Sequence, residues 1–146
     1  MDLSHQILLV EDDADAREAI TCGLELRGAD VTSAADGYEA VHALCNGARP
    51  CVIVLDLDLP SIREFRRRQL LWPQMARIPV IVLSGHSDLK MATWAMARAV
   101  LGKPVEFGRL VRAVDEYCSH ADPKASARRL RLSRTHAWSS ASASRN

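Results

Sequence analysis

A strongly apolar stretch of the sequence, "VIVLDLDLP" at residues 52–60, carries two aspartates near its end. Val and Ile favour extended backbone, and a run that is apolar on both faces is typical of a strand buried in a parallel sheet. An ionised carboxylate beside such a strand, as at Asp56, is unfavourable unless a cation or a hydrogen-bond donor compensates its charge. The stretch therefore predicts that other chemical groups of the chain lie close to Asp56.

Three further apolar runs end in polar residues that could meet Asp56. Glu11 and Asp12 follow "QILLV", Ser84 follows "IPVIVL", and Lys103 follows "AVLG". In a parallel sheet the carboxyl ends of the strands share one edge, where such folds bind ligands. Carboxylates gathered there repel one another without a cation, and hard oxygen ligands suit Mg²⁺, which leaves room for a phosphate. A lysine and a hydroxyl are suitable donors to a phosphoryl group, so the set predicts Mg²⁺-dependent phosphoryl chemistry.

The elements that must position these residues alternate along the chain. Apolar periodicity and turn residues predict strands at 6–10, 30–34, 51–56, 78–84 and about 99–102, and helices at 13–27, 37–47, 62–72, 87–99 and 105–118. Asp13 or Asp15 could cap the first helix, and Gly28 could end it. Five βα repeats predict an α/β fold: an open five-stranded parallel sheet, doubly wound with helices on both faces into a three-layer sandwich.

Charge divides the chain into two parts. Residues 1–118 carry 13 Lys and Arg against 17 Asp and Glu, a net charge of −4, whereas residues 119–146 carry six basic residues and one acidic residue. The second part is rich in Ser, Ala and Arg and has little apolar periodicity, which is typical of disorder. We therefore expect one folded domain over 1–118 and a disordered basic tail over 119–146. The run "RRR" at 66–68 is expected on a solvated helix face.

The sequence shows neither a membrane span nor a secretion signal. No apolar run approaches the ~18 residues of a spanning helix, and "MDLSHQ" lacks a basic start followed by an apolar stretch. We therefore expect a cytoplasmic protein. Its four cysteines show no CxxC spacing, which disfavours a zinc site, and we expect reduced thiols that pack as small apolar groups. They are Cys22, Cys45, Cys51 and Cys118.

Four motifs, in this order, resemble the receiver domain of two-component response regulators. They are "ILLVEDDADAR", "VLDLDLP", "VIVLSGHSD" and "GKPVEFGRLVRAV", and the resemblance covers about residues 6–118. The stretch "SGHSDLKMATWAM" is most similar to the FixJ-like branch of that family. The resemblance implies the CheY-like, flavodoxin-like form of the doubly wound fold, which agrees with the order of the expected strands and helices.

The resemblance implies a role for each acidic residue of the set. Asp56 matches the phosphoacceptor, which takes a phosphoryl group from a phosphohistidine of a partner kinase. Glu11 and Asp12 match the acidic pair that holds Mg²⁺, directly or through water, and Asp56 is a ligand of the same metal. Asp58 matches the position whose backbone carbonyl completes the metal shell.

The resemblance also implies roles at the ends of the last two strands. Ser84 matches the Ser/Thr that turns toward the phosphoryl oxygens, and Lys103 matches the lysine that pairs with the acyl phosphate. The bond between Lys103 and Pro104 is cis in the family. His86 matches a position that influences the lifetime of the phosphoryl group, and a solvated loop histidine is the equal alternative.

These roles imply a single-domain response regulator, a switch that accepts a phosphoryl group and signals by a conformational change. It is not an enzyme, apart from slow autophosphatase activity at most. The implied partner is a sensor histidine kinase or phosphotransfer protein of a bacterial two-component system, and the chain is expected as a monomer or weak homodimer. No helix-turn-helix pattern follows Cys118, so we expect no DNA-binding domain.

Three departures from the family pattern leave a second reading open. The segment 61–77 is shorter than usual and lacks the glycine of the family's loop, and the segment 87–102 is also short. Val100 stands where the family has an aromatic or equivalent residue that moves on activation. The alternative function is a degenerate receiver that binds partners without phosphorylation.

A third reading is a haloacid-dehalogenase-like phosphatase, because Asp56 and Asp58 mimic the Asp-x-Asp pair of that family. The pair normally follows the first strand and has Thr or Val two places later. Here it follows the third strand, and Pro60 stands two places later. The order of the motifs therefore favours the receiver.

Overall fold

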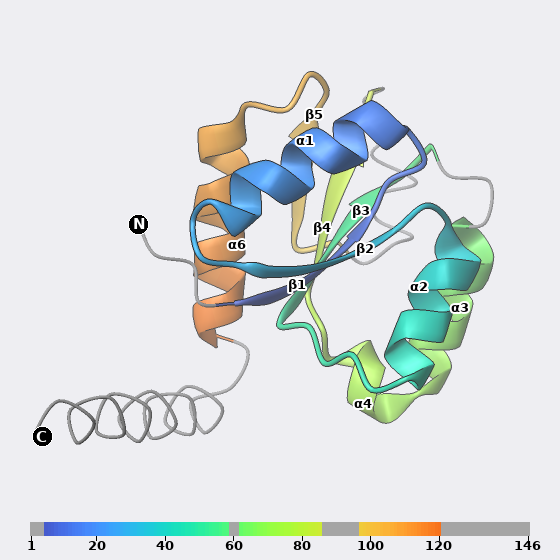
Figure 1. The fold of residues 1–146 in the computed structure, drawn as a ribbon. Helices are drawn as coiled ribbons and strands as arrows, with labels where there is room; N and C mark the ends of the chain where they lie inside the picture. The colour runs from blue at the N-terminus through green and yellow to red at the C-terminus, as the bar shows by residue number, and fades with distance from the viewer. Residues whose placement is uncertain (1–4, 59–61, 86–96, 121–146) are drawn as a thin grey trace, which may run out of the picture.

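The structure is a computed structural model that describes residues 5–58, 62–85 and 97–120. Five strands form a single sheet at its centre: β1 (Gln6–Val10), β2 (Asp30–Ala34), β3 (Val52–Asp56), β4 (Val80–Ser84) and β5 (Ala99–Gly102). Their order across the sheet is β2-β1-β3-β4-β5, and every neighbouring pair is parallel (Figure 1). The predicted five-stranded parallel sheet is confirmed.

Helices cover both faces of this sheet. On one face lie α1 (Ala14–Glu25) and α6 (Phe107–His120); on the other lie α2 (Gly37–Cys45), α3 (Ile62–Leu71) and α4 (Pro73–Ala76) (Figure 1). The sequence did not predict α4, because four residues carry too little periodicity to be recognised. The helix predicted at 87–99 lies largely outside the described residues. The arrangement is the three-layer sandwich that the βα repeats predict.

Alternate residues of the central strands contribute to two separate cores. On β1, Ile7 and Leu9 belong to the core beneath α1 and α6, whereas Leu8 and Val10 belong to the core beneath α2 and α3. Because both faces of the strand are covered from Ile7 to Val10, these four residues are all apolar. A slip of one residue would exchange the two faces, so burial fixes the register of the sheet. The register in turn fixes which residues meet at the carboxyl edge.

Aspartate caps begin the helices that follow β1 and β2. Asp13 Oδ1 accepts a hydrogen bond from the Ala16 N–H at 2.8 Å, and Asp36 Oδ1 accepts one from the Glu39 N–H at 2.8 Å. Gly28, with a φ of 89°, takes the left-handed conformation that ends the turn after α1. Because α1 begins so soon after β1, the link between them stays at the carboxyl edge.

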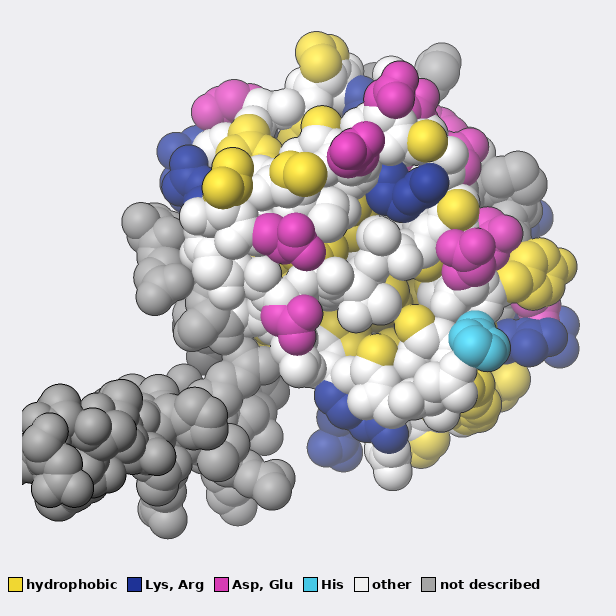
Figure 2. All heavy atoms as spheres, viewed as in Figure 1, with side chains coloured by type: hydrophobic (Ala, Val, Ile, Leu, Met, Phe, Trp, Pro, Cys, Tyr) yellow, Lys and Arg dark blue, Asp and Glu magenta, His cyan; other side chains and the backbone are white. Residues whose placement is uncertain are grey.

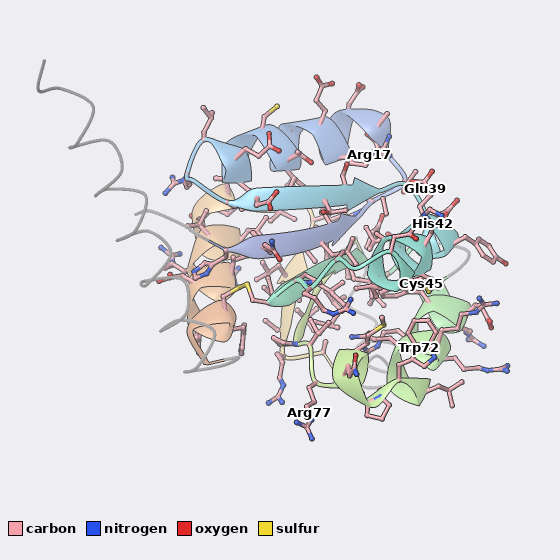
Figure 3. All side chains as sticks on the ribbon, turned by 60° about the horizontal axis from the view of Figure 1, so that its bottom comes forward. Arg17, Glu39, His42, Cys45, Trp72 and Arg77 are labelled. Atoms are coloured by element: carbon pink, nitrogen blue, oxygen red, sulfur yellow. A yellow bond between two sulfur atoms is a disulfide. The ribbon has the colours of Figure 1, made fainter. Side chains whose placement is uncertain are left out.

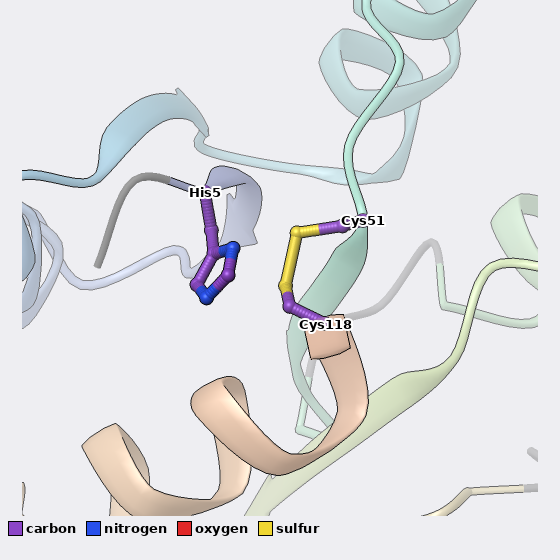
Figure 4. Close-up of side chains that lie close together, drawn as sticks. All are labelled: His5, Cys51 and Cys118. Atoms are coloured by element: carbon purple, nitrogen blue, oxygen red, sulfur yellow. A yellow bond between two sulfur atoms is a disulfide. The ribbon is translucent and has the colours of Figure 1, made fainter. Parts of the chain in front are cut away.

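The cysteines do not match the expectation of four reduced thiols. Cys51, just before β3, and Cys118, near the end of α6, form a disulfide across a sequence separation of 67 residues (Figure 4). Cys22 and Cys45 are free thiols, and both are exposed rather than packed in the core. The expectation was wrong for the bonded pair because the amino end of β3 and the end of α6 meet only in the folded chain.

The basic run at 66–68 is only partly solvated. Arg67 and Arg68 are exposed, and Arg68 pairs with Glu64 at 2.7 Å. Arg66 is 3% exposed; its guanidinium donates a hydrogen bond to Gln69, and burial lowers its pKa. The expected solvated face is therefore wrong for Arg66, because three consecutive helical residues span more than half of the helix circumference.

Acidic side chains are spread over the face that α1 and β2 form (Figure 2). The exposed residues of these elements include Asp15, Glu18 and Asp30. This distribution agrees with the negative net charge of residues 1–118. Among the helices that the structure describes, none is long and apolar enough to cross a membrane.

Candidate functional site

The register of the sheet brings the predicted acidic residues together. Val10 pairs with Leu55, so the residues that follow them, Glu11 and Asp56, are neighbours at the carboxyl edge. The carboxylates of these two residues and of Asp12 lie within 4.8 Å of one another. Glu11 and Asp56 are each 1% exposed, whereas Asp12 is exposed. The result is a carboxylate cluster that is buried on one side and open to solvent on the other.

Lys103 reaches this cluster from the end of β5. Its Nζ lies 3.0 Å from Asp56 Oδ2 and 3.6 Å from Glu11 Oε2. Its backbone N–H donates a hydrogen bond to the Ser84 carbonyl at 2.8 Å, which ties the loop after β5 to the end of β4. The Lys103–Pro104 peptide bond is cis, as the resemblance implies. One lysine thus faces two buried carboxylates.

The charges of the cluster do not balance. Burial first, and then the charge of Asp56, raise the pKa of Glu11 to about 7, although Lys103 lowers it. The Oε2 atom of Glu11 is buried and has no hydrogen-bond partner among the described residues. Burial alone would lower the pKa of Lys103, but its hydrogen bond to Asp56 and the nearby carboxylates hold that pKa above its usual value. The single positive charge of Lys103 does not balance the three carboxylates, and a divalent cation would supply the missing charge.

Ser84 and Asp58 flank the cluster. Ser84 is the last residue of β4, is 6% exposed, and pairs with Gly102 in the register. The Asp58 N–H donates a hydrogen bond to Asp56 Oδ1 at 3.0 Å, so the chain turns back over the end of β3. The Asp58 carboxylate lies beside Gly85, where an added Cβ would be 3.6 Å from its Oδ2. The structure therefore gathers every described residue of the predicted set at one edge.

Sequence reasoning missed one contact of this site. Arg17, one turn into α1, donates from Nη1 to the Glu11 carbonyl at 2.9 Å and to the Asp12 carbonyl at 3.4 Å (Figure 3). It thereby holds the backbone of the link between β1 and α1. The signal that could have found it is a basic residue one turn after the helix cap that follows the acidic pair. His86, to which the resemblance gives a role, lies outside the described residues.

Comparisons with known proteins identify the family of the chain. The model of the response regulator receiver domain matches residues 7–115. The C4-dicarboxylate transport transcriptional regulatory protein DctD of Pseudomonas aeruginosa is 34% identical over 116 residues, 77% of this chain and 25% of DctD. The transcriptional regulatory protein FixJ of Bradyrhizobium diazoefficiens is 29% identical over 122 residues, 82% of this chain and 59% of FixJ. This chain therefore spans less than two thirds of either relative.

A solved receiver domain supports the same assignment. The receiver domain of sensor histidine kinase PA1611 from Pseudomonas aeruginosa PAO1, crystallised with a magnesium ion in its active-site cleft, matches with a TM-score of 0.71. The two are 28% identical, and the match covers 79% of this chain and 98% of that domain. Fold, motif order and sequence identity agree: the chain belongs to the receiver domain family of response regulators.

Proposed function

We propose that the chain is a phosphoryl-accepting switch in which Asp56 is the acceptor. The observation that carries the proposal is the buried Asp56 carboxylate beside an acidic pair, with Lys103 Nζ at 3.0 Å. The carboxylate attacks the phosphorus of a phosphohistidine, and the new P–O bond forms as the P–N bond breaks. The histidine ring keeps the electron pair of the broken bond and takes up a proton, and the product is an aspartyl phosphate.

Glu11, Asp12 and Asp56 are the residues that would hold a magnesium ion, with the backbone carbonyl of Asp58 as a further ligand. Three features support the fit: the spacing of the carboxylates, the buried Glu11 Oε2 without a hydrogen-bond partner among the described residues, and the raised pKa of Glu11. When bound, the ion supplies positive charge for the phosphoryl oxygens. Arg17 keeps the backbone of the acidic pair in place for this role.

Lys103 and Ser84 are the residues proposed to respond to phosphorylation. Lys103 is shared between Asp56 and Glu11, and the Ser84 carbonyl accepts a hydrogen bond from its backbone. Phosphorylation replaces the single negative charge of the Asp56 carboxylate with roughly two negative charges on the phosphoryl oxygens. These charges compete with Glu11 for the Lys103 ammonium and offer a new acceptor to the Ser84 hydroxyl, so the ends of β4 and β5 rearrange together.

The receiver unit is proposed to span residues 1–118 and to act in the bacterial cytoplasm as a monomer or weak homodimer. Its proposed partner is a sensor histidine kinase or a phosphotransfer protein. The family is one of signalling switches rather than classical enzymes, so at most slow autophosphatase activity is expected of this chain. The phosphorylation-independent alternative is not favoured, because the acceptor, the acidic pair, the hydroxyl and the lysine all meet at one edge.

Intact mass after incubation with acetyl phosphate tests the proposal. The wild type, Asp56→Asn and the exposed α1 control Glu18→Gln are incubated with and without Mg²⁺. We expect one phosphoryl group, removable by hydroxylamine, on the wild type and on Glu18→Gln only with Mg²⁺, and none on Asp56→Asn. Phosphorylation of Asp56→Asn to the wild-type level would refute the assignment. Turnover of a generic aryl phosphate would favour the phosphatase reading instead.

A further inference from the structure

A second cluster of metal-ligating side chains lies at the amino edge of the sheet, opposite the carboxylates. His5 directly precedes β1, Cys51 directly precedes β3, and Cys118 lies near the end of α6. One ring nitrogen of His5 and the two sulfur atoms lie within 4.8 Å of one another (Figure 4). Three elements that are far apart in the sequence thus bring a nitrogen and two sulfurs to one point.

This cluster is partly shielded from solvent. Cys118 is 8% exposed, Cys51 is half-buried, and the His5 side chain is 18% exposed. Cys51 Sγ lies 3.1 Å from the Gln6 carbonyl oxygen, beside the start of β1. Limited solvent access together with soft ligand atoms favours a bound metal ion, because water competes less for the ligands.

Asp115 of α6 orients the His5 ring. The Nε2 atom of His5 lies 3.5 Å from Asp115 Oδ1, and Figure 4 shows the ring beside the disulfide with a nitrogen on the side of the sulfur atoms. A carboxylate that holds one imidazole nitrogen while the other nitrogen binds metal is the usual arrangement around a zinc-ligating histidine. The ring therefore already has the orientation that a ligand needs.

The disulfide must open before the sulfurs can bind a metal. A dithiol reductant, the class that keeps cytoplasmic cysteines reduced, gives two electrons and two protons to the sulfurs and becomes a disulfide itself. A tetrahedral zinc site with Zn–S distances of about 2.3 Å places its sulfurs about 3.8 Å apart. The Cα atoms of Cys51 and Cys118 are 5.1 Å apart, so rotation of the two side chains reaches that separation.

We propose that Cys51, Cys118 and His5 form a zinc-binding site when the disulfide is reduced. Zn²⁺ displaces the two thiol protons, so the ion meets two thiolates and one imidazole, and a water completes the four ligands. The disulfide and the zinc-bound form are mutually exclusive states of one cysteine pair. The missing CxxC spacing does not count against the site, because its ligands come from three elements rather than from one loop.

Co²⁺ titration of the full chain tests the proposal, because tetrahedral cobalt reports thiolate ligands by intense charge-transfer absorption. Under anaerobic conditions, the protein is reduced with a phosphine and stripped of metal with a chelator. It is then titrated with Co²⁺ and afterwards with Zn²⁺. We expect one equivalent of Co²⁺ to give the charge-transfer bands and one equivalent of Zn²⁺ to bleach them. The unreduced disulfide form should give no bands.

Variants separate the proposed ligands from the other thiols. Cys118→Ser and His5→Ala should weaken Zn²⁺ binding at least about tenfold. The double variant Cys22→Ser/Cys45→Ser, which changes the two exposed thiols, should leave binding unchanged. Asp56→Asn should also leave it unchanged, which separates this site from the phosphoryl site.

Three results would overturn the zinc site. The first is a folded, reduced wild type that binds no stoichiometric Co²⁺ or Zn²⁺. The second is a His5→Ala variant that binds as tightly as the wild type. The third is loss of the bands in Cys22→Ser/Cys45→Ser. If Cys118→Ser does not fold by circular dichroism, His5→Ala decides, because it keeps both thiols of the site.

Discussion

Strands β1 and β3 carry a different set of ligand atoms at each end. At the carboxyl end, Glu11 and Asp56 present hard oxygen atoms, and Lys103 compensates their negative charge only in part. At the amino end, His5 and Cys51 present nitrogen and sulfur, and Cys51 is bonded to α6. The two ends are about 16 Å apart, the length of five extended residues.

The difference between the two ends separates reactivity from stability. Burial at the carboxyl end holds like charges closer together than they would lie in water, which lowers stability at the proposed phosphoryl and cation site. The link at the amino end closes a long loop and stabilises the same sheet. An electrostatically unfavourable site therefore needs a rigid frame, and here both are built on two strands.

Reduction of the Cys51–Cys118 disulfide at the amino end should change the free energy of unfolding the most. In the chain-entropy account, a crosslink across 67 residues stabilises the fold by about 4 kcal/mol. We expect urea unfolding of the oxidised and the reduced, metal-free protein to differ by an amount of that order. The rate of phosphorylation by acetyl phosphate should differ by less than about twofold between the oxidised and the reduced protein, since distant sites act independently. A stability difference below about 1 kcal/mol would show that the link does little to fasten α6.

Removing the charge of Glu11 at the carboxyl end should raise the free energy of unfolding, whereas reduction of the disulfide lowers it. The pKa of folded Glu11 is about 7 against 4.5 as its ordinary value, so between these values the metal-free folded state binds more protons than the unfolded chain. The contribution of Glu11 to stability therefore falls as pH rises through this window. We expect Glu11→Gln to raise the unfolding free energy by about 3 kcal/mol at about pH 8, and to change it little at about pH 4.5.

Urea unfolding in chelator at both pH values measures this effect, with Glu18→Gln as the control on the exposed face of α1. Mg²⁺ should stabilise the wild type more than Glu11→Gln, since the substitution removes one carboxylate from the proposed ligands. Equal effects of Glu11→Gln and Glu18→Gln would mean that no electrostatic penalty exists at the carboxyl end.

Removing the side-chain hydrogen bonds of Arg17 to the backbone at the carboxyl end should have the smallest energetic effect. Arg17→Ala removes the hydrogen bonds to the carbonyls of Glu11 and Asp12, which contribute about 1 kcal/mol together. We expect calorimetry to show a several-fold weaker Mg²⁺ affinity, while zinc binding at His5 is unchanged. If Arg17→Ala weakened Mg²⁺ binding and zinc binding equally, Arg17 would act through the stability of the whole fold instead.

The carboxyl end could be predicted because one fold rule places all of its members. Apolar runs locate the strands, parallel strands end at one edge, and the residues that follow each run must meet there. Glu11, Asp56 and Lys103 could therefore be grouped without any coordinates. The hydrogen bonds of Arg17 could not be predicted from the sequence, because they depend on the backbone conformation of the link before α1.

The amino end escaped prediction for a different reason. His5 and Cys51 precede strands, and no rule of parallel sheets marks such positions as ligand sites. Their partner Cys118 lies 67 residues beyond Cys51, near the end of a helix whose place over the sheet the sequence does not specify. A composition argument then favoured reduced thiols, since cytoplasmic disulfides are rare. The buried position of Arg66 was missed in the same way, because it depends on tertiary packing.

The bond between Cys51 and Cys118 also changes the covalent topology of the chain. While it is closed, residues 51–118 form a ring that contains Asp56, Ser84 and Lys103. Glu11 and Asp12 lie outside that ring and meet its members only by folding. A single peptide cleavage anywhere inside the ring leaves one covalent molecule until a reductant is added, whereas a cleavage between Asp12 and Cys51 breaks the covalent link between the acidic pair and Asp56 at once.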